Sequence, residues 1–102
     1  MSHFKDKLPK NWVSIEEGKE SVFSNELKRE LILGHVLFDK KAVAIARKVG
    51  EDDILFFFEN QENQYAEVHL TWSNETNPKW PSTLIFRSFN DWKETIEDDD
   101  MK

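Results

Sequence analysis

The chain of 102 residues is long enough for one domain and too short for two. It contains no cysteine, which excludes disulfides and thiolate chemistry, and its 13% aromatic content predicts a packed core instead of a disordered chain. The formal net charge of −6 disfavours nucleic acid and anionic membranes as partners, and it favours a basic protein partner.

No segment has the features of a targeting or membrane-spanning element. Residues 1–10 are charged and no apolar run follows them, which is unlike a signal peptide. The longest uninterrupted apolar run, residues 54–58, is far shorter than the ~20 residues that a membrane-spanning helix requires. The sequence therefore predicts a soluble, cytoplasmic protein.

The first 18 residues are mostly polar and are interrupted by Pro9 and Gly18, so a loosely ordered N-terminal arm is expected over 1–18. One apolar island in the arm is expected to dock on the core as a short edge strand: Trp12, Val13 and Ile15. The compact domain is then expected to start at residue 19.

A short helix is predicted after this arm. Ser24 or Asn25 can accept a hydrogen bond from the free N–H groups of a first helical turn. Leu27 and Leu31 lie one turn apart on one helix face, and Gly34 is suited to the C-terminal cap.

Residues 41–49 fit two secondary structures. Their alanines are compatible with a helix, but their β-branched residues and the polar turn at 50–53 favour a strand. In that strand Arg47 interrupts an apolar alternation, so we expect it either at an edge or paired with an acid such as Asp53 or Glu67.

The next two segments predict an antiparallel hairpin. Residues 54–58 are apolar at every position, which is typical of a central strand covered on both faces. A polar loop at 60–64 leads to an alternating strand over 65–72. With that loop, Phe56 is expected opposite Val68.

The alternation over 65–72 divides the second hairpin strand into two faces. One face is expected to be core: Ala66, Val68, Leu70 and Trp72. The other mixes aromatic and polar groups and is left either to carry function or to be covered by a helix: Tyr65, Glu67, His69 and Thr71.

A further strand is predicted over 83–87, followed by a closing helix. Ser88 offers an N-terminal cap, with Asp91 three residues later. The helix should present one apolar stripe to the core: Phe89, Trp92 and Ile96. The acids that follow are unfavourable at the negative end of a helix, so a frayed acidic tail is expected over 98–102.

Together these elements predict an α+β fold, in which an antiparallel meander of three to four strands carries an N-terminal and a C-terminal helix. A single domain is expected over 19–97. The sequence does not predict the oligomeric state beyond a monomer or a weak homodimer.

No catalytic constellation is visible in the sequence. The three histidines are far apart and have no ligand partner at metal-site spacing, so neither a metal nor a cofactor is expected. Glu67 and His69 share a strand face, where a carboxylate–imidazole pair is feasible. The candidate binding surface consists of Arg47, Glu67, His69, Trp80 and His35.

The order of motifs resembles that of a family of small, functionally uncharacterised bacterial proteins. The most specific element is the strand over 68–72, which reads Val-His-Leu-Thr-Trp, with Trp80-Pro81 and the helical Trp92 downstream. The resemblance covers residues 27–92. It implies a bacterial, cytosolic domain and transfers no activity, and Val36 departs from the proline expected at that position.

Three functions are compatible with these features. The leading hypothesis is a non-enzymatic protein-interaction module, because the chain combines an aromatic-rich surface with no catalytic constellation. A narrower form of it is an antitoxin-like immunity protein that binds a basic toxin through its acidic surface. The alternative is a small ligand-binding or hydrolase-like protein that uses Glu67, His69 and Arg47.

Overall fold

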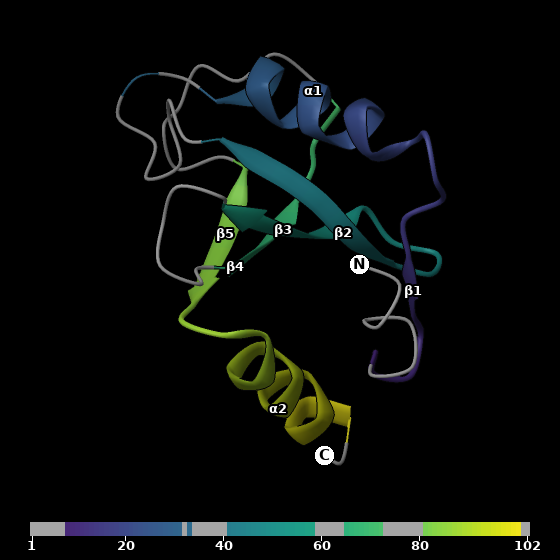
Figure 1. Ribbon diagram of the computed structural model, residues 1–102. Helices are drawn as coiled ribbons and strands as arrows, with labels where there is room; N and C mark the ends of the chain where they lie inside the picture. The colour runs from purple at the N-terminus through teal and green to yellow at the C-terminus, as the bar shows by residue number, and fades with distance from the viewer. Residues whose placement is uncertain (1–7, 32, 34–40, 59–64, 73–80, 101–102) are drawn as a thin grey trace.

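A computed structural model describes residues 8–31, 33, 41–58, 65–72 and 81–100, except for the side chains of the last two. Its elements are, in chain order, β1 (Trp12–Ser14), α1 (Glu20–Glu30), β2 (Ala42–Lys48), β3 (Asp53–Phe58), β4 (Tyr65–His69), β5 (Ser82–Phe86) and α2 (Phe89–Asp100). The strands form one antiparallel sheet in the order β1-β2-β3-β4-β5 (Figure 1). The α+β meander is confirmed, but the sheet has five strands instead of three to four, because the apolar island at Trp12 pairs fully with β2.

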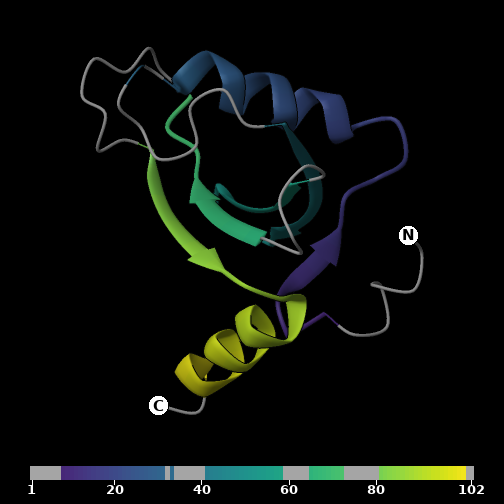
Figure 2. The same cartoon turned by 60° about the vertical axis from the view of Figure 1, so that its left-hand side comes forward.

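The two helices cover opposite faces of the sheet (Figures 1 and 2). Under α1, Leu27 packs with Phe56 and Val68 in one buried cluster. On the other face, Trp92 of α2 packs against Trp12, with ring centroids 4.9 Å apart in an edge-to-face arrangement. Strand β3 is therefore buried on both faces, which explains its uninterrupted apolar run.

Strand β2 confirms the strand interpretation of 41–49 and contains a β-bulge. Its register with β3 shifts by one residue between Ala44 and Ala46. Ala44 consequently belongs to the cluster under α1, whereas Ala46 belongs to the cluster under α2. The predicted simple alternation is wrong beyond the bulge, and Arg47 lies on the α1 face.

The β3–β4 hairpin has a register two residues away from the predicted one. Phe56 pairs with Ala66 and not with Val68, which pairs instead with Ile54. A shift of two keeps every side chain on its predicted face, because side chains alternate with a period of two. The apolar pattern cannot distinguish such registers, and the predicted loop at 60–64 lies outside the described residues.

The predicted core face of β4 is correct up to its end. Ala66, Val68 and Leu70 are buried in the cluster under α1. Trp72 is 44% exposed, so its predicted place in the core is wrong. The reason is its backbone φ of 57°, which is not the extended conformation of a strand. The alternation of faces therefore does not extend to the Trp72 side chain.

Helix α1 begins before the predicted Ser24. Its N-terminal cap residue is Lys19, which makes no side-chain capping hydrogen bond. Gly18 turns the chain with a φ of 89°, and its N–H donates to Glu20 Oε1 at 2.9 Å. The helix is thus started by a glycine turn and not by a capping side chain. The predicted C-terminal cap, Gly34, lies outside the described residues.

Helix α2 confirms its predicted start. The N–H of Asp91 donates to Ser88 Oγ at 3.1 Å, as an N-terminal cap requires. The helix continues to Asp100, past the predicted end of the domain at 97, since the charge–dipole penalty of its acids is only ~1 kcal/mol or less each. Within the described ranges, neither helix is long and apolar enough to cross a membrane.

Candidate functional site

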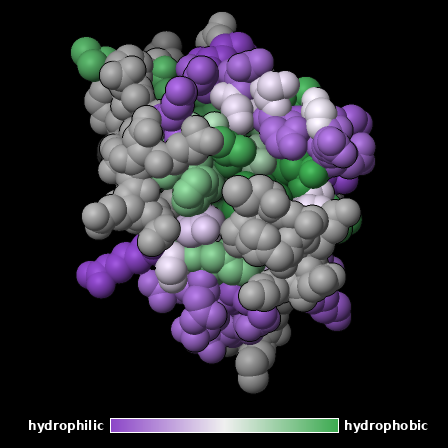
Figure 3. Space-filling view, in the orientation of Figure 1, coloured by the Kyte–Doolittle hydropathy of each residue, from purple (hydrophilic) through white to green (hydrophobic). Residues whose placement is uncertain are grey.

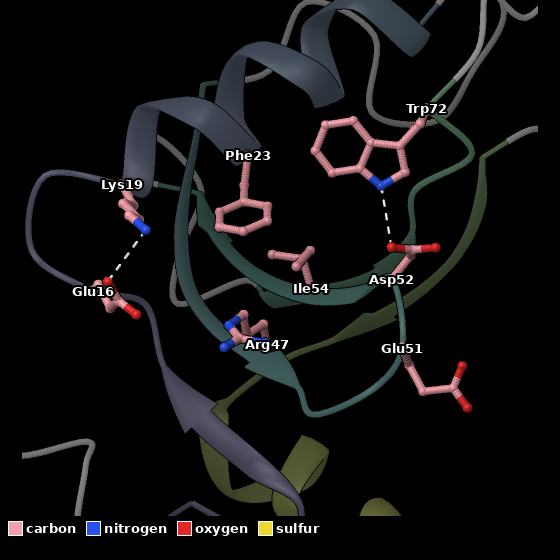
Figure 4. A pocket seen from close by; sticks show the side chains of 8 residues that line it. All are labelled: Glu16, Lys19, Phe23, Arg47, Glu51, Asp52, Ile54 and Trp72. Atoms are coloured by element: carbon pink, nitrogen blue, oxygen red, sulfur yellow. Dashed lines mark hydrogen bonds and ion pairs between the residues drawn. The ribbon is translucent and has the colours of Figure 1, made fainter.

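A pocket of about 280 Å³ lies between the start of α1, the β2–β3 turn and the end of β4 (Figure 4). Its apolar lining consists of Phe23, Ile54 and Trp72. Its charged lining consists of Glu16, Lys19, Arg47, Glu51 and Asp52. In the orientation of Figure 1, most apolar surface lies between the hydrophilic outer sides of α1 and α2 (Figure 3).

The backbone of Trp72 is held by a buried carboxylate. Glu30, the last residue of α1, has no exposed surface. Its Oε1 accepts from Thr71 N–H at 2.8 Å and from Thr71 Oγ1 at 3.0 Å, and its Oε2 accepts from Trp72 N–H at 2.6 Å. These hydrogen bonds fix the left-handed conformation of Trp72, which costs ~1–3 kcal/mol for a residue other than glycine.

The indole of Trp72 is fixed at the rim of the pocket by two further contacts. Its Nε1–H donates to Asp52 Oδ1 at 3.2 Å. Its ring meets Phe23 edge to face, with centroids 6.3 Å apart and an interplanar angle of 68°. A large aromatic surface is therefore positioned and still accessible, since the residue is 44% exposed.

A second carboxylate adjoins Glu30. Glu26 accepts from Arg29 Nε at 2.9 Å and from Arg29 Nη2 at 2.6 Å. Burial raises the pKa of Glu30, and so does its hydrogen bond with Glu26, although the N–H groups of Thr71 and Trp72 lower it in part. Burial alone would raise the pKa of Glu26, but hydrogen bonds with Arg29 and Glu30 outweigh it, so that pKa is lowered.

Arg47 reaches the pocket because of the β-bulge, which places it on the α1 face beside Ile54. Its side chain is half-buried. Within the described part of the chain it makes no ion pair or hydrogen bond, so the predicted pairing with Asp53 or Glu67 is not formed. The pocket thus combines ring faces, an aliphatic side chain and a guanidinium whose donors bind none of the described residues, and these groups are suited to recognition.

The predicted grouping of Glu67, His69 and Arg47 is not assembled. Glu67 faces α2, where it accepts from Trp92 Nε1–H at 3.0 Å, on the opposite side of the sheet from Arg47. That face is covered by α2 near Glu67, while His69 at the end of β4 stays exposed.

His69 pairs with its cross-strand neighbour on β3. His69 Nδ1 lies 2.6 Å from Asp53 Oδ1, and the two residues are register partners. The hydrogen bond with Asp53 raises the pKa of His69, an effect that the nearby acids of the β2–β3 turn reinforce and that burial opposes. In this pairing, the residue opposite His69 on the neighbouring strand provides the hydrogen-bond partner of its Nδ1 atom.

The two other predicted site residues, His35 and Trp80, lie outside the described residues. Sequence reasoning missed Phe23 and Glu30, and it assigned Trp72 to the core. A signal for Trp72 existed in its place at the end of a strand before a polar loop, whereas Glu30 had none, because its partners lie 41 and 42 residues along the chain. Among the described residues no three His, Cys, Asp or Glu side chains gather as a metal site.

Comparisons of the chain with protein-family models, with curated proteins and with solved structures gave no match. The resemblance to small bacterial proteins therefore stays a prediction, and function has to be argued from the geometry of the pocket.

Proposed function

We propose that the chain is a small non-enzymatic protein-interaction module whose binding surface is the pocket beside Trp72. The observation that carries the proposal is the exposed indole of Trp72. The backbone of this residue is in an unfavourable conformation, which a hydrogen bond to buried Glu30 holds in place. Strained residues persist only where their surroundings fix them, and they are concentrated at binding sites. Among the described residues, Trp72 belongs to neither buried cluster of the core, which supports a role outside the fold.

The composition of the pocket supports a protein partner. Tryptophan and arginine are the residues most enriched at the energetic centres of protein interfaces, and here Trp72 and Arg47 line the same pocket. Its volume of about 280 Å³ is at the small end of the range of ligand pockets. A pocket of that size suits one side chain of a larger partner.

A random-peptide selection on the intact protein tests this proposal. Selected peptides should bind the wild type and lose at least about tenfold in affinity on Trp72→Ala, because an aromatic anchor typically contributes ~2 kcal/mol or more. Leu84→Ala is the matched control, since Leu84 is 58% exposed on β5 and outside the pocket lining. Peptides that bind Trp72→Ala as well as the wild type would refute the pocket as the binding surface.

A second candidate uses the other helix. One side of α2 gathers four acids, Asp91, Glu94, Glu97 and Asp98, in a chain whose net charge is −6. This favours an antitoxin-like role, in which the acidic side of α2 neutralises a basic protein. Binding of a basic partner should then weaken steeply with salt and with the double substitution E94Q/E97Q, and salt-independent binding would contradict it.

A further inference from the structure

Of the two cations that line the pocket, Lys19 pairs with Glu16, whereas Arg47 makes no hydrogen bond or ion pair with the described residues. Arg47 is half-buried, and its side chain lies beside Ile54 and below Phe23 in the view of Figure 4. We propose, building on the proposed interaction function, that the pocket captures the C-terminal residue of a partner chain, with Arg47 binding its carboxylate. The apolar side chain of that residue would pack between Phe23, Ile54 and Trp72.

The acids of the pocket do not take the place of this ligand. Glu16 forms an ion pair with Lys19, with 3.4 Å between Oε2 and Nζ, and Asp52 accepts the indole N–H of Trp72. Glu51 points away from the rings in Figure 4. The planar fork of a guanidinium matches a carboxylate in a bidentate arrangement, which is stronger than a hydrogen bond between neutral groups.

The size and the mixed lining of the pocket favour a chain terminus over an internal acidic side chain. A volume of about 280 Å³ accommodates roughly one residue. Within that space an apolar surface and a cation are adjacent, so the complementary group carries an apolar side chain and a carboxylate on the same residue. Only the last residue of a polypeptide carries both.

The acids at the rim of the pocket should limit the charge of the group that binds. Glu51 and Asp52 are exposed at the rim and oppose any added negative charge. They should therefore select a single carboxylate and reject multiply charged groups. Removing one rim charge with Glu51→Gln should tighten the binding of a terminal carboxylate and leave the binding of its amide unchanged.

The test uses two acetylated pentapeptides of sequence Gly-Ser-Gly-Ser-Leu, one with a free C-terminal carboxylate and one with a C-terminal amide. Binding to the intact protein is followed by the NMR signal of the Trp72 indole N–H. The amide should bind about tenfold or more weakly. Arg47→Met should remove this difference, whereas Arg47→Lys should keep part of it because the charge remains without the fork.

Lys48→Met is the matched control, because it removes the same charge from the next residue of β2. The side chain of Lys48 points to the opposite face of the sheet from Arg47. Urea unfolding of each variant checks that the domain is intact. Equal binding of the two pentapeptides, or an unchanged preference in folded Arg47→Met, would overturn the assignment. Tighter binding of free leucine than of the pentapeptide would also overturn it, since the site would then suit a free amino acid.

The proposed interaction function and the proposed role of Arg47 can be refuted independently of each other. If selected peptides bind through Trp72 without any preference for a terminal carboxylate, the module stands and the role of Arg47 is wrong. If the carboxylate preference depends on Arg47 but binding is unaffected by Trp72→Ala, the positioned indole is not the anchor.

Discussion

Replacing Glu30 by alanine should remove the support of Trp72 and destabilise the whole domain. The buried carboxylate accepts hydrogen bonds from Thr71 N–H, Thr71 Oγ1 and Trp72 N–H. Each of these donors loses its partner in the variant, at about 1 kcal/mol apiece, so the free energy of unfolding should fall by about 3 kcal/mol. That loss is a large fraction of the ~5–15 kcal/mol by which a domain of this kind is stable.

Glu30→Gln gives an internal control because it keeps the shape of the side chain. One oxygen remains for Thr71, but the new amide group cannot accept from the Trp72 N–H, which in the wild type lies 2.6 Å from Oε2. The neutral amide also relieves the cost of burying a charge, the same cost that raises the pKa of Glu30. The loss should therefore be intermediate, at ~1–2 kcal/mol. Urea unfolding of the three proteins measures these differences, and the indole N–H signal reports whether Trp72 moves. Equal unfolding midpoints and slopes for wild type and Glu30→Ala would refute the reasoning.

The contacts of the sheet and α2 determine how three further substitutions should change stability. The raised pKa of His69 means that its pair with Asp53 stabilises fully below pH 6.5 and is lost as pH rises through that pKa. Since the His69 side chain is 52% exposed, His69→Gln should cost below ~1 kcal/mol at pH 6 and nothing at pH 9 by urea unfolding; a larger loss at pH 9 would contradict this. Ser88→Ala should cost ~1 kcal/mol by removing the cap, with reduced helical circular dichroism if α2 frays, and an unchanged melting temperature would argue against the cap. Trp92→Phe should cost ~2–3 kcal/mol in urea unfolding, because it leaves a cavity and takes the indole donor from Glu67; a loss below 1 kcal/mol would show that the core repacks.

Local patterns predicted the parts of the fold that depend on local chemistry. The cap at Ser88 and the apolar stripe of α2 follow from side-chain spacing, and the structure confirms both. The two faces of the hairpin follow from alternation, but its register does not, because registers two residues apart bury the same side chains. The β-bulge in β2 also had no signal, since Ala44 and Ala46 are equally small and fit either face.

The candidate site was harder to predict because it depends on long-range contacts. Arg47 was singled out as an exception to an apolar pattern, but the bulge moved it away from Glu67 and His69. The hydrogen bond between Glu30 and Trp72 joins residues 42 positions apart, and a glutamate in a helix is ordinarily exposed. Its burial becomes visible only when α1 is packed against the end of β4.

In the proposed function, the surface around Trp72 and Arg47 binds a protein partner. The most direct measurement is an NMR titration of the intact, isotopically labelled protein with a peptide selected on the wild type. Shift changes should be centred on the Trp72 indole N–H, on Arg47 and on the first turns of α1. In Trp72→Ala, the changes at Arg47 and α1 should be absent. Changes centred on the acidic side of α2, with the Trp72 indole N–H unmoved, would contradict binding at this surface.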